Sequence, residues 1–242
     1  MRQDKIHEMS EKEEAYWWFA ARKQMILSLF EKYARPGDEL LDAGCGAGLL
    51  TYEAGKKYMV TSVDVDSVSI ELCKKRKPHA KVIQKNIEQT LPWKNTFKLV
   101  CLTDVLEHVD DEKVMKNIHK VLKNNGVVIA TVPAYPWLFS YWDVIHQHKR
   151  RYTAKSIQEL FESSGFVIHH FSYFNSIFFP IILGIRMIKS LISQRKVVST
   201  DCFDLPRSTN NLLFNIFRME TQFAVSHTIP FGLSILVVAK KK

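Results

Sequence analysis

The 242-residue sequence is poor in cysteine: it has four, Cys45, Cys73, Cys101 and Cys202, with no CxxC pair and no Cys/His ligand pattern. Wide spacing of this kind argues against a disulfide framework and is typical of thiols in a reducing cytosol, and we predict no metal site. The sequence also lacks an uninterrupted apolar run of about 20 residues, an opening signal-like segment, internal repeats and low-complexity stretches. These absences predict a cytoplasmic globular protein.

Length and charge narrow the class further. A chain of 242 residues with 46% hydrophobic content can bury one large core, so we predict a single domain over residues 1–242. The net charge of +9 favours anionic partners such as phosphate, nucleic acid or a membrane surface, although it also serves general solubility. The basic residues do not alternate with aromatic ones and form no recognition motif, so nucleic acid is not the expected partner.

Strand and helix signals alternate along most of the chain. Residues 1–34 are helix-rich and stop at Pro36-Gly37. Strands are predicted at 38–44, 59–65, 81–87, 97–105, 126–133, 167–173 and 233–241, and helices at 67–76, 110–124 and 156–166. Alternation of this kind indicates a largely parallel sheet with helices on both faces, which is the α/β doubly wound architecture.

The most informative stretch is "LLDAGCGAGLL", where a predicted strand ends at Asp42 and a helix follows a glycine-rich turn. Glycines 44, 46 and 48 let the backbone approach a ligand closely at the start of that helix. Leu49 stands where a dinucleotide fingerprint needs its third glycine, so the GxGxG spacing favours a nucleoside with a smaller tail. Asp64 follows at the end of the second strand, where a carboxylate can accept both ribose hydroxyls.

At these residues the chain resembles the class I S-adenosylmethionine-dependent methyltransferases, over about 38–173 and again over 228–241. The resemblance implies a seven-stranded sheet, mostly parallel with the last strand antiparallel, and S-adenosylmethionine as cofactor. It places Asp42 near the amino group of the methionine moiety, the turn backbone beside the cofactor, Asp64 on the ribose and Val65 along the adenine. The full set of cofactor-contacting residues that we expect is Trp18, Arg22, Asp42, Gly44, Cys45, Gly46, Gly48, Asp64, Val65, Asn86, Ile87, Thr103, Asp104 and His108.

Two members of that set depart from the family pattern. Asn86-Ile87 occupies a place where many relatives have Asp-Ala, and an amide can still hydrogen-bond the adenine edge. His108, in "TDVLEHVDD", could equally pack or cap a helix. Two other readings of the whole chain stay open. One is a nicotinamide-dependent oxidoreductase, which Leu49 at the third-glycine position argues against. The other is a cofactor-binding adaptor without turnover.

Residues 14–22, "EAYWWFAAR", place three aromatic side chains in a row on a predicted helix. Because neighbours on a helix are about 100° apart, Trp17, Trp18 and Phe19 cannot all face one core. We interpret the helix as an N-terminal flap that belongs to no layer of the sheet and covers the cofactor, with Arg22 near its carboxylate. The alternative is a helix wedged between two packed surfaces.

The candidate acceptor-side residues lie in "YWDVIHQHKRRYT", after the fifth strand. A histidine could take a proton from a hydroxyl acceptor, and paired arginines suit a carboxylate or phosphate on the substrate. We name His146, His148, Arg151 and Tyr152 as catalytic candidates, with Asp143 and Arg150 beside them. A solvated basic loop is the alternative. The stretches "YWWFAAR" and "HKRRYT" also resemble a subset of the family linked to glycoconjugate or lipid modification, which implies a small-molecule or lipid- or sugar-linked acceptor.

Residues 174–228 form a predicted helical insertion that is apolar at first and basic later. Pro180, Gly184, Arg186 and Lys189 interrupt its apolar run, so it does not fit a membrane span. We favour a hydrophobic cap over the acceptor pocket or a homodimer surface, and keep open a peripheral membrane contact through 174–196.

Overall fold

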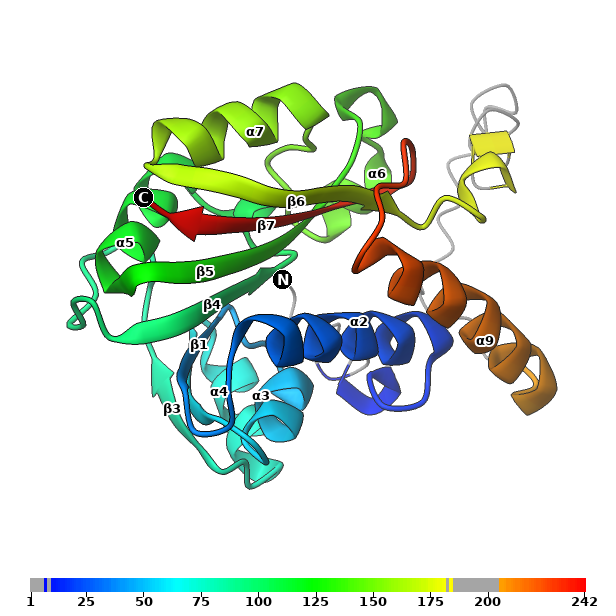
Figure 1. Cartoon of the computed structure of the whole chain (residues 1–242). Helices are drawn as coiled ribbons and strands as arrows, with labels where there is room; N and C mark the ends of the chain where they lie inside the picture. Colours follow the sequence, from blue (N-terminus) through cyan, green and yellow to red (C-terminus); the bar gives the residue numbers. More distant parts are fainter. Residues whose placement is uncertain (1–6, 8–9, 182, 185–204) are drawn as a thin grey trace.

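The computed structural model describes residues 7, 10–181, 183–184 and 205–242 and contains one seven-stranded sheet (Figure 1). The strand order is β3-β2-β1-β4-β5-β7-β6, and β7 runs antiparallel to both of its neighbours while the other pairs are parallel. The strands are β1 Glu39–Ala43, β2 Met59–Asp64, β3 Ala80–Gln84, β4 Phe97–Thr103, β5 Leu122–Pro133, β6 Phe166–Phe174 and β7 Ser234–Lys241. The predicted α/β doubly wound fold is confirmed, and its strand order reverses between β1 and β4.

Helices cover both faces of this sheet. They are α2 Trp17–Tyr33, α3 Leu49–Ala54, α4 Ser67–Lys75, α5 Asp111–Val121, α6 Tyr141–Ile145, α7 Ala154–Ser163 and α9 Arg207–Ala224, with short 3₁₀ turns η1 Leu106–His108 and η2 Pro136–Leu138. Residues of β5 alternate between the two resulting cores: Val128 belongs to the cluster with α5 and α7, and Ile129 to the cluster with α2 and α9. Burial on both faces explains why the central strands read as continuous apolar runs.

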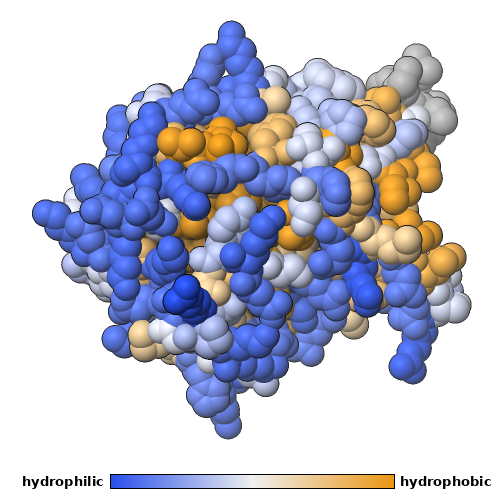
Figure 2. All heavy atoms as spheres, viewed as in Figure 1, coloured by the Kyte–Doolittle hydropathy of each residue, from blue (hydrophilic) through white to orange (hydrophobic). Residues whose placement is uncertain are grey.

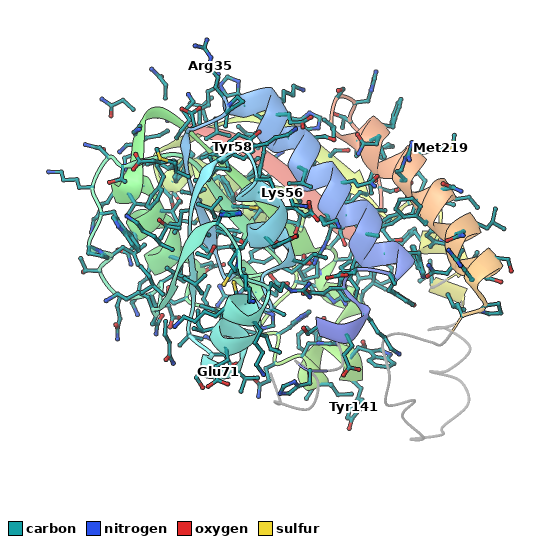
Figure 3. All side chains as sticks on the ribbon, turned by 90° about the horizontal axis from the view of Figure 1, so that it is seen from below. Arg35, Lys56, Tyr58, Glu71, Tyr141 and Met219 are labelled. Atoms are coloured by element: carbon teal, nitrogen blue, oxygen red, sulfur yellow. The ribbon has the colours of Figure 1, made fainter. Side chains whose placement is uncertain are left out.

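Helix α2 is part of a sheet layer, which corrects the interpretation of a flap that belongs to none. Its side chains Met25, Ile26 and Leu29 are buried on the same side of the sheet as Leu99 of β4. Seen from below, α2 lies between α3 and α9 (Figure 3). Its first turns carry the aromatic run, which packs against the edge of the same core and also lines a cavity at the sheet's carboxyl edge.

One element boundary also differs from the prediction. Helix α5 ends at Val121 and β5 begins at Leu122, whereas the sequence pattern predicted helix to 124 and strand from 126. Leu122 pairs with Phe97 of β4, and Asn125 adopts a positive φ of 58° just before Gly126. Pairing with a neighbouring strand therefore overrides the local helical preference of "KVLKN".

The predicted insertion contributes α9, which packs along α2. The Asn210 side chain accepts a hydrogen bond from the Trp17 backbone N–H at 3.0 Å and donates one to the Ala15 carbonyl at 2.8 Å, so α9 holds the start of α2. Exposed apolar side chains gather over residues 177–181 and α9, on the right of Figure 2. Residues 182 and 185–204 of the insertion, which include most of the predicted membrane-contact segment 174–196, lie outside the described residues.

None of the helices in the described part of the chain is both long enough and apolar enough to cross a membrane.

Candidate functional site

A cavity of about 900 Å³ opens at the carboxyl edge of the sheet, where β1 and β4 meet. Open α/β sheets bind ligands at such a reversal of strand order, because the loops that leave the two strands diverge there. Residues at the strand ends line the cavity: Asp42 as the next-to-last residue of β1 and Gly44 directly after it, Asp64 as the last residue of β2, and Asp104 directly after β4. Trp18 and Arg22 of α2 close it from the other side.

The glycine-rich turn comes close to two neighbouring elements. A Cβ on Gly44 would lie 2.4 Å from Cγ2 of Val105, and one on Gly48 would lie 2.3 Å from Sγ of Cys73 on α4. Both glycines also have a positive φ, of +84° and +83°. A Cβ on Gly46, in contrast, meets nothing within 4 Å. The turn therefore needs glycine for its shape at two positions and leaves a bare backbone facing open space at the third, a cradle that fits a nucleoside cofactor.

Asp42 and Asp64 are the two carboxylates held against this turn. Asp42 is buried and accepts a hydrogen bond from Oγ1 of Thr51 at 2.6 Å. Burial raises the pKa of Asp42 to about 6, although the bond from Thr51 opposes the shift. Asp64 accepts hydrogen bonds from the backbone N–H groups of Gly46 and Asp66, each at 2.9 Å, while burial raises its pKa. Each Asp64 oxygen retains acceptor capacity that could serve a ribose hydroxyl.

Arg22 and Asp104 form an ion pair that joins α2 to the end of β4. The guanidinium also lies 4.3 Å from the centre of the Trp18 ring, and burial lowers the pKa of Arg22 to about 10. Asp104 has a positive φ of 54° and accepts a hydrogen bond from Thr131 at 3.0 Å. The pair places a cation and a stacked aromatic ring at the cavity wall, an arrangement that can hold a small zwitterion.

A second group of titratable residues lines the cavity where η1 meets the loop at 146–152. The His108 and His148 rings are perpendicular with centres 4.8 Å apart, and the His146 ring lies 5.7 Å from that of His148. Burial and the neighbouring His148 lower the pKa of His108 to about 4. Glu107 is 1% exposed, and burial raises its pKa to about 8. Glu107, His108 and His148 together could hold a metal ion.

A hydrogen-bond network behind the cavity holds the loop at 146–152 in place. Asp143 is buried and accepts hydrogen bonds from Nδ1 of His148 at 3.0 Å, from Nε of Arg151 at 2.7 Å and from the Ser140 backbone at 2.7 Å. Burial alone would raise the pKa of Asp143, but the bonds from His148 and Arg151 outweigh it and hold that pKa below its ordinary value. The loop therefore stands on a buried charge network.

Most of the predicted site residues meet in this one cavity. All the predicted cofactor residues except Gly48 line it, as do His146 and His148. Arg151 and Tyr152 do not. Arg151 donates hydrogen bonds to Asp143 and to the Ala134 carbonyl. The buried Tyr152 hydroxyl lies 2.7 Å from Asp111 Oδ2 and 3.0 Å from the Leu106 carbonyl. Their contacts orient the loop.

Sequence reasoning missed two acids of the cavity wall, the buried Glu107 and the half-buried Glu13. Glu107 lies in the same motif as Asp104 and His108, and what sets it apart is that its carboxylate has no hydrogen-bond partner among the residues that the structure describes. Glu13 lies in the helix-rich N-terminal segment and is paired with Arg76 at 3.2 Å, and burial raises its pKa to about 7. Nothing in the local sequence pattern marks Glu13 as half-buried.

The fold and site define a class of protein, and comparisons with known proteins agree. The sequence pattern of the family described as "Methyltransferase domain" matches residues 16–170, which is more than half of the chain. The chain belongs to this family and is a class I S-adenosylmethionine-dependent methyltransferase. The family assignment decides against the nicotinamide-dependent oxidoreductase.

Three individual relatives are between 26% and 32% identical to this chain. An uncharacterised protein of Methanocaldococcus jannaschii is 32% identical over 202 residues, 83% of this chain and 82% of the relative. A ribosomal protein L11 methyltransferase of Thermosipho melanesiensis is 26% identical over 53% of the chain and 51% of the relative. A mitochondrial ubiquinone biosynthesis O-methyltransferase of Schizosaccharomyces pombe is 30% identical over 42% of the chain and 40% of the relative.

Among solved structures, phosphoethanolamine N-methyltransferase 2 of Haemonchus contortus, in complex with S-adenosyl-L-methionine, superposes with a TM-score of 0.60. The superposition covers 89% of this chain and 51% of that one at 17% identity, so it shows a shared fold.

Proposed function

We propose that this chain transfers the methyl group of S-adenosylmethionine to a small-molecule acceptor, free or linked to a lipid or sugar, within the cavity at the carboxyl edge of the sheet. The observation that carries the proposal is the continuity of that cavity: the glycine turn, Asp64 and the histidines of the 146–152 loop all line one space of about 900 Å³. Cavities of this size accommodate small ligands.

The cofactor half of the cavity would hold its ligand through three sets of contacts. Asp64 would accept the ribose hydroxyls, Asn86 and Val65 would contact the adenine, and Asp42 with the turn backbone would face the methionine moiety. Trp18 and Arg22 would cover that moiety from α2. The bound cofactor supplies an electrophilic methyl group, and the residues of the chain would contribute mainly by holding donor and acceptor in line, which can lower a barrier by up to about 7–11 kcal/mol.

The acceptor half would be the part lined by His108, His146 and His148. A hydroxyl acceptor needs a group to receive its proton, and an imidazole can meet that need. The names of the relatives point to different acceptors, because one methylates a ribosomal protein and another acts in ubiquinone biosynthesis. The enclosed position of the histidines favours the small molecule. Exposed Ile177 and Ile181 suit a lipid-linked form and a peripheral membrane contact, and a homodimer through the same apolar surface is the alternative.

The cofactor assignment is tested by Asp64→Ala. Loss of hydrogen bonds to a charged group should weaken S-adenosylmethionine binding by about 1.5–3 kcal/mol, roughly 10- to 150-fold, in titration calorimetry. Glu71→Ala removes an exposed carboxylate at the periphery of α4 (Figure 3) and should bind like the parent protein. Equal affinity of all three proteins would contradict the assignment of Asp64.

The acceptor assignment is tested by turnover. The protein is incubated with S-adenosylmethionine and a lysate of its host, and mass spectrometry of the small-molecule fraction identifies the compound that gains one methyl group. His148→Ala should then lower turnover strongly while S-adenosylmethionine affinity stays within about threefold of the parent. If methyl groups appear only in the protein fraction of the lysate, the acceptor is a macromolecule and the small-molecule proposal fails.

A further inference from the structure

The Glu107 carboxylate has no hydrogen-bond partner for either oxygen among the described residues, although the residue is 1% exposed. It lies at the wall of the cavity, in η1. Buried carboxylates without a partner are rare, because desolvation of a polar group that makes no compensating bond is strongly unfavourable. Arg22 and Arg151 act on Glu107 only through longer-range electrostatics. The geometry therefore leaves a buried carboxyl group at the cavity wall with no compensating bond among the described residues.

His108 and His148 lie beside this carboxylate. One ligand atom from each of the three residues can be chosen so that all three lie within 4.8 Å of one another. Ligand atoms bonded at about 2.1 Å to one tetrahedral ion lie about 3.4 Å apart, so closure around an ion needs the ligand atoms to approach one another by up to about 1.4 Å. Changes in the side-chain torsion angles of His108 and His148, which are half-buried, are sufficient for a change of that size.

Both imidazoles are oriented as metal-ligating histidines usually are. Nδ1 of His148 lies 3.0 Å from Oδ1 of Asp143, and Nδ1 of His108 lies 3.3 Å from the Gln147 carbonyl oxygen. In each case Nδ1–H donates to an oxygen and Nε2 keeps its lone pair. Ligating histidines characteristically donate their second ring nitrogen to a carboxylate or a carbonyl, which fixes the tautomer and makes the other nitrogen a better ligand.

The fold holds the three groups together without a ligand. The Lys149 backbone N–H donates to the Glu107 carbonyl at 2.7 Å, which ties η1 to the loop that carries His148. That loop is anchored in turn by the Asp143–Arg151 pair and by the Ala134–Tyr152 bridge. A site built on such supports is preorganised, and binding would need little further ordering of the chain.

We propose that Glu107, His108 and His148 bind one divalent transition-metal ion, of the zinc, manganese or iron(II) class, on the acceptor side of the cavity. Two imidazoles and one carboxylate suit these ions better than magnesium or calcium, which prefer all-oxygen sites. Three protein ligands leave coordination positions open towards the cavity, as in catalytic rather than structural metal sites.

The role of the ion rests on the proposed function. An acceptor hydroxyl bound to the ion would lose its proton to solvent more readily, because the cation stabilises the oxyanion. The oxygen would then form a bond to the methyl carbon as the carbon–sulfur bond breaks, and the electron pair of that bond would neutralise the sulfonium. His148 and His108 would act as ligands in this scheme, and neither would have to serve as a base.

The binding test uses full-length protein that has been stripped with a chelator and contains no S-adenosylmethionine. Calorimetry with zinc ion should show one ion per chain, and Glu107→Gln and His148→Ala should each weaken it by at least about 100-fold. His169→Ala removes an exposed histidine of β6, outside the cluster, and should bind zinc like the parent. Thermal unfolding in chelator establishes that each variant is folded. Absence of zinc binding by the parent, or binding by both cluster variants as tight as that of the parent, overturns the proposal.

A spectroscopic measurement keeps the proposal open to refutation if Glu107→Gln does not fold. Copper(II) bound to the parent protein with ¹⁵N-labelled histidine should show coupling to two imidazole nitrogens, and His148→Ala should show one. Coupling to no histidine nitrogen overturns the site. Methyl transfer is measured separately with and without chelator. Metal binding without any product would refute the proposed function alone, and undiminished methyl transfer by a protein that binds no metal would refute this inference alone.

Discussion

Replacing Asp42 with asparagine should change how the stability of the protein depends on pH. Asp42 sits in the core at the end of β1, and no basic side chain is among its main interaction partners. Burial raises its pKa from 3.8 to about 6, the Thr51 bond lowers it, and the nearby Asp64 raises it further. Asparagine keeps the shape of the side chain and cannot ionise, so the substitution isolates the effect of the charge.

The sign of the effect follows from which state releases the proton first. Between pH 3.8 and about 6 the unfolded chain ionises Asp42 while the folded chain keeps it protonated. The folded state then binds more protons, so raising the pH through this window favours unfolding. The stability that Asp42 contributes is therefore complete below the lower value and is lost as the pH rises through the higher one.

The magnitude comes from the same two pKa values. A difference of about two units corresponds to about 3 kcal/mol over the whole window, and about 2 kcal/mol of it falls between about pH 4.5 and about pH 7.5. Urea unfolding of parent and Asp42→Asn is measured at both pH values without cofactor. The stability of the variant relative to the parent should improve by about 2 kcal/mol at the higher pH.

Comparison of one substitution at two pH values removes packing effects, which do not depend on pH. A difference between the two proteins that is the same at both pH values would refute the reasoning, because it would mean that Asp42 ionises alike in the folded and unfolded chains. A difference that changes across the window and becomes constant below it would agree with the raised pKa of Asp42.

Three further predictions concern packing around the cavity. Gly48→Ala should lower the free energy of unfolding by about 1–3 kcal/mol more than Gly37→Ala in urea unfolding, because both have positive φ but only Gly48 faces Cys73; equal losses would contradict the close approach of the turn to α4. Arg151→Ala should destabilise by about 3 kcal/mol, because it leaves Asp143 buried with one partner fewer. Arg150→Ala should lose less than about 1 kcal/mol, because Arg150 is half-exposed and the buried Asp111 keeps its hydrogen bond from Tyr152. The reverse order in thermal or urea unfolding would count against the network. Trp18→Ala should weaken S-adenosylmethionine binding and the protection that the cofactor gives residues 1–30 against proteolysis. Trp17→Ala loses contacts with Phe178 and Phe217 and should mainly lower the melting temperature. Equal losses of affinity in the two variants would contradict these separate roles.

The order of strands and helices could be predicted from the sequence because that information is local. Apolar periodicity marks each element, and the spacing of Gly44, Gly46 and Gly48 before a helix, with Asp64 after the next strand, points to a nucleoside site without any tertiary contact. Parallel strands place their carboxyl ends at one edge. For this reason residues as far apart in sequence as Asp42, Asn86 and Asp104 could be expected to meet in one cavity.

The roles of the individual side chains at the site depend on contacts between segments that are far apart in the sequence. The aromatic run of α2 gave no sign that Trp17 would pack against Phe178 and Phe217 while Trp18 would stack on Arg22 at the cavity. Arg151 and Tyr152 looked available for catalysis, and only the fold shows them engaged with Asp143 and Asp111. Glu107 is the opposite case. Its neighbours in sequence give no reason to single it out, and only the fold shows that its buried carboxylate has no hydrogen-bond partner among the described residues. A sequence states which groups a chain carries, but burial and partners, which set their charge and reactivity, arise only when distant segments pack together.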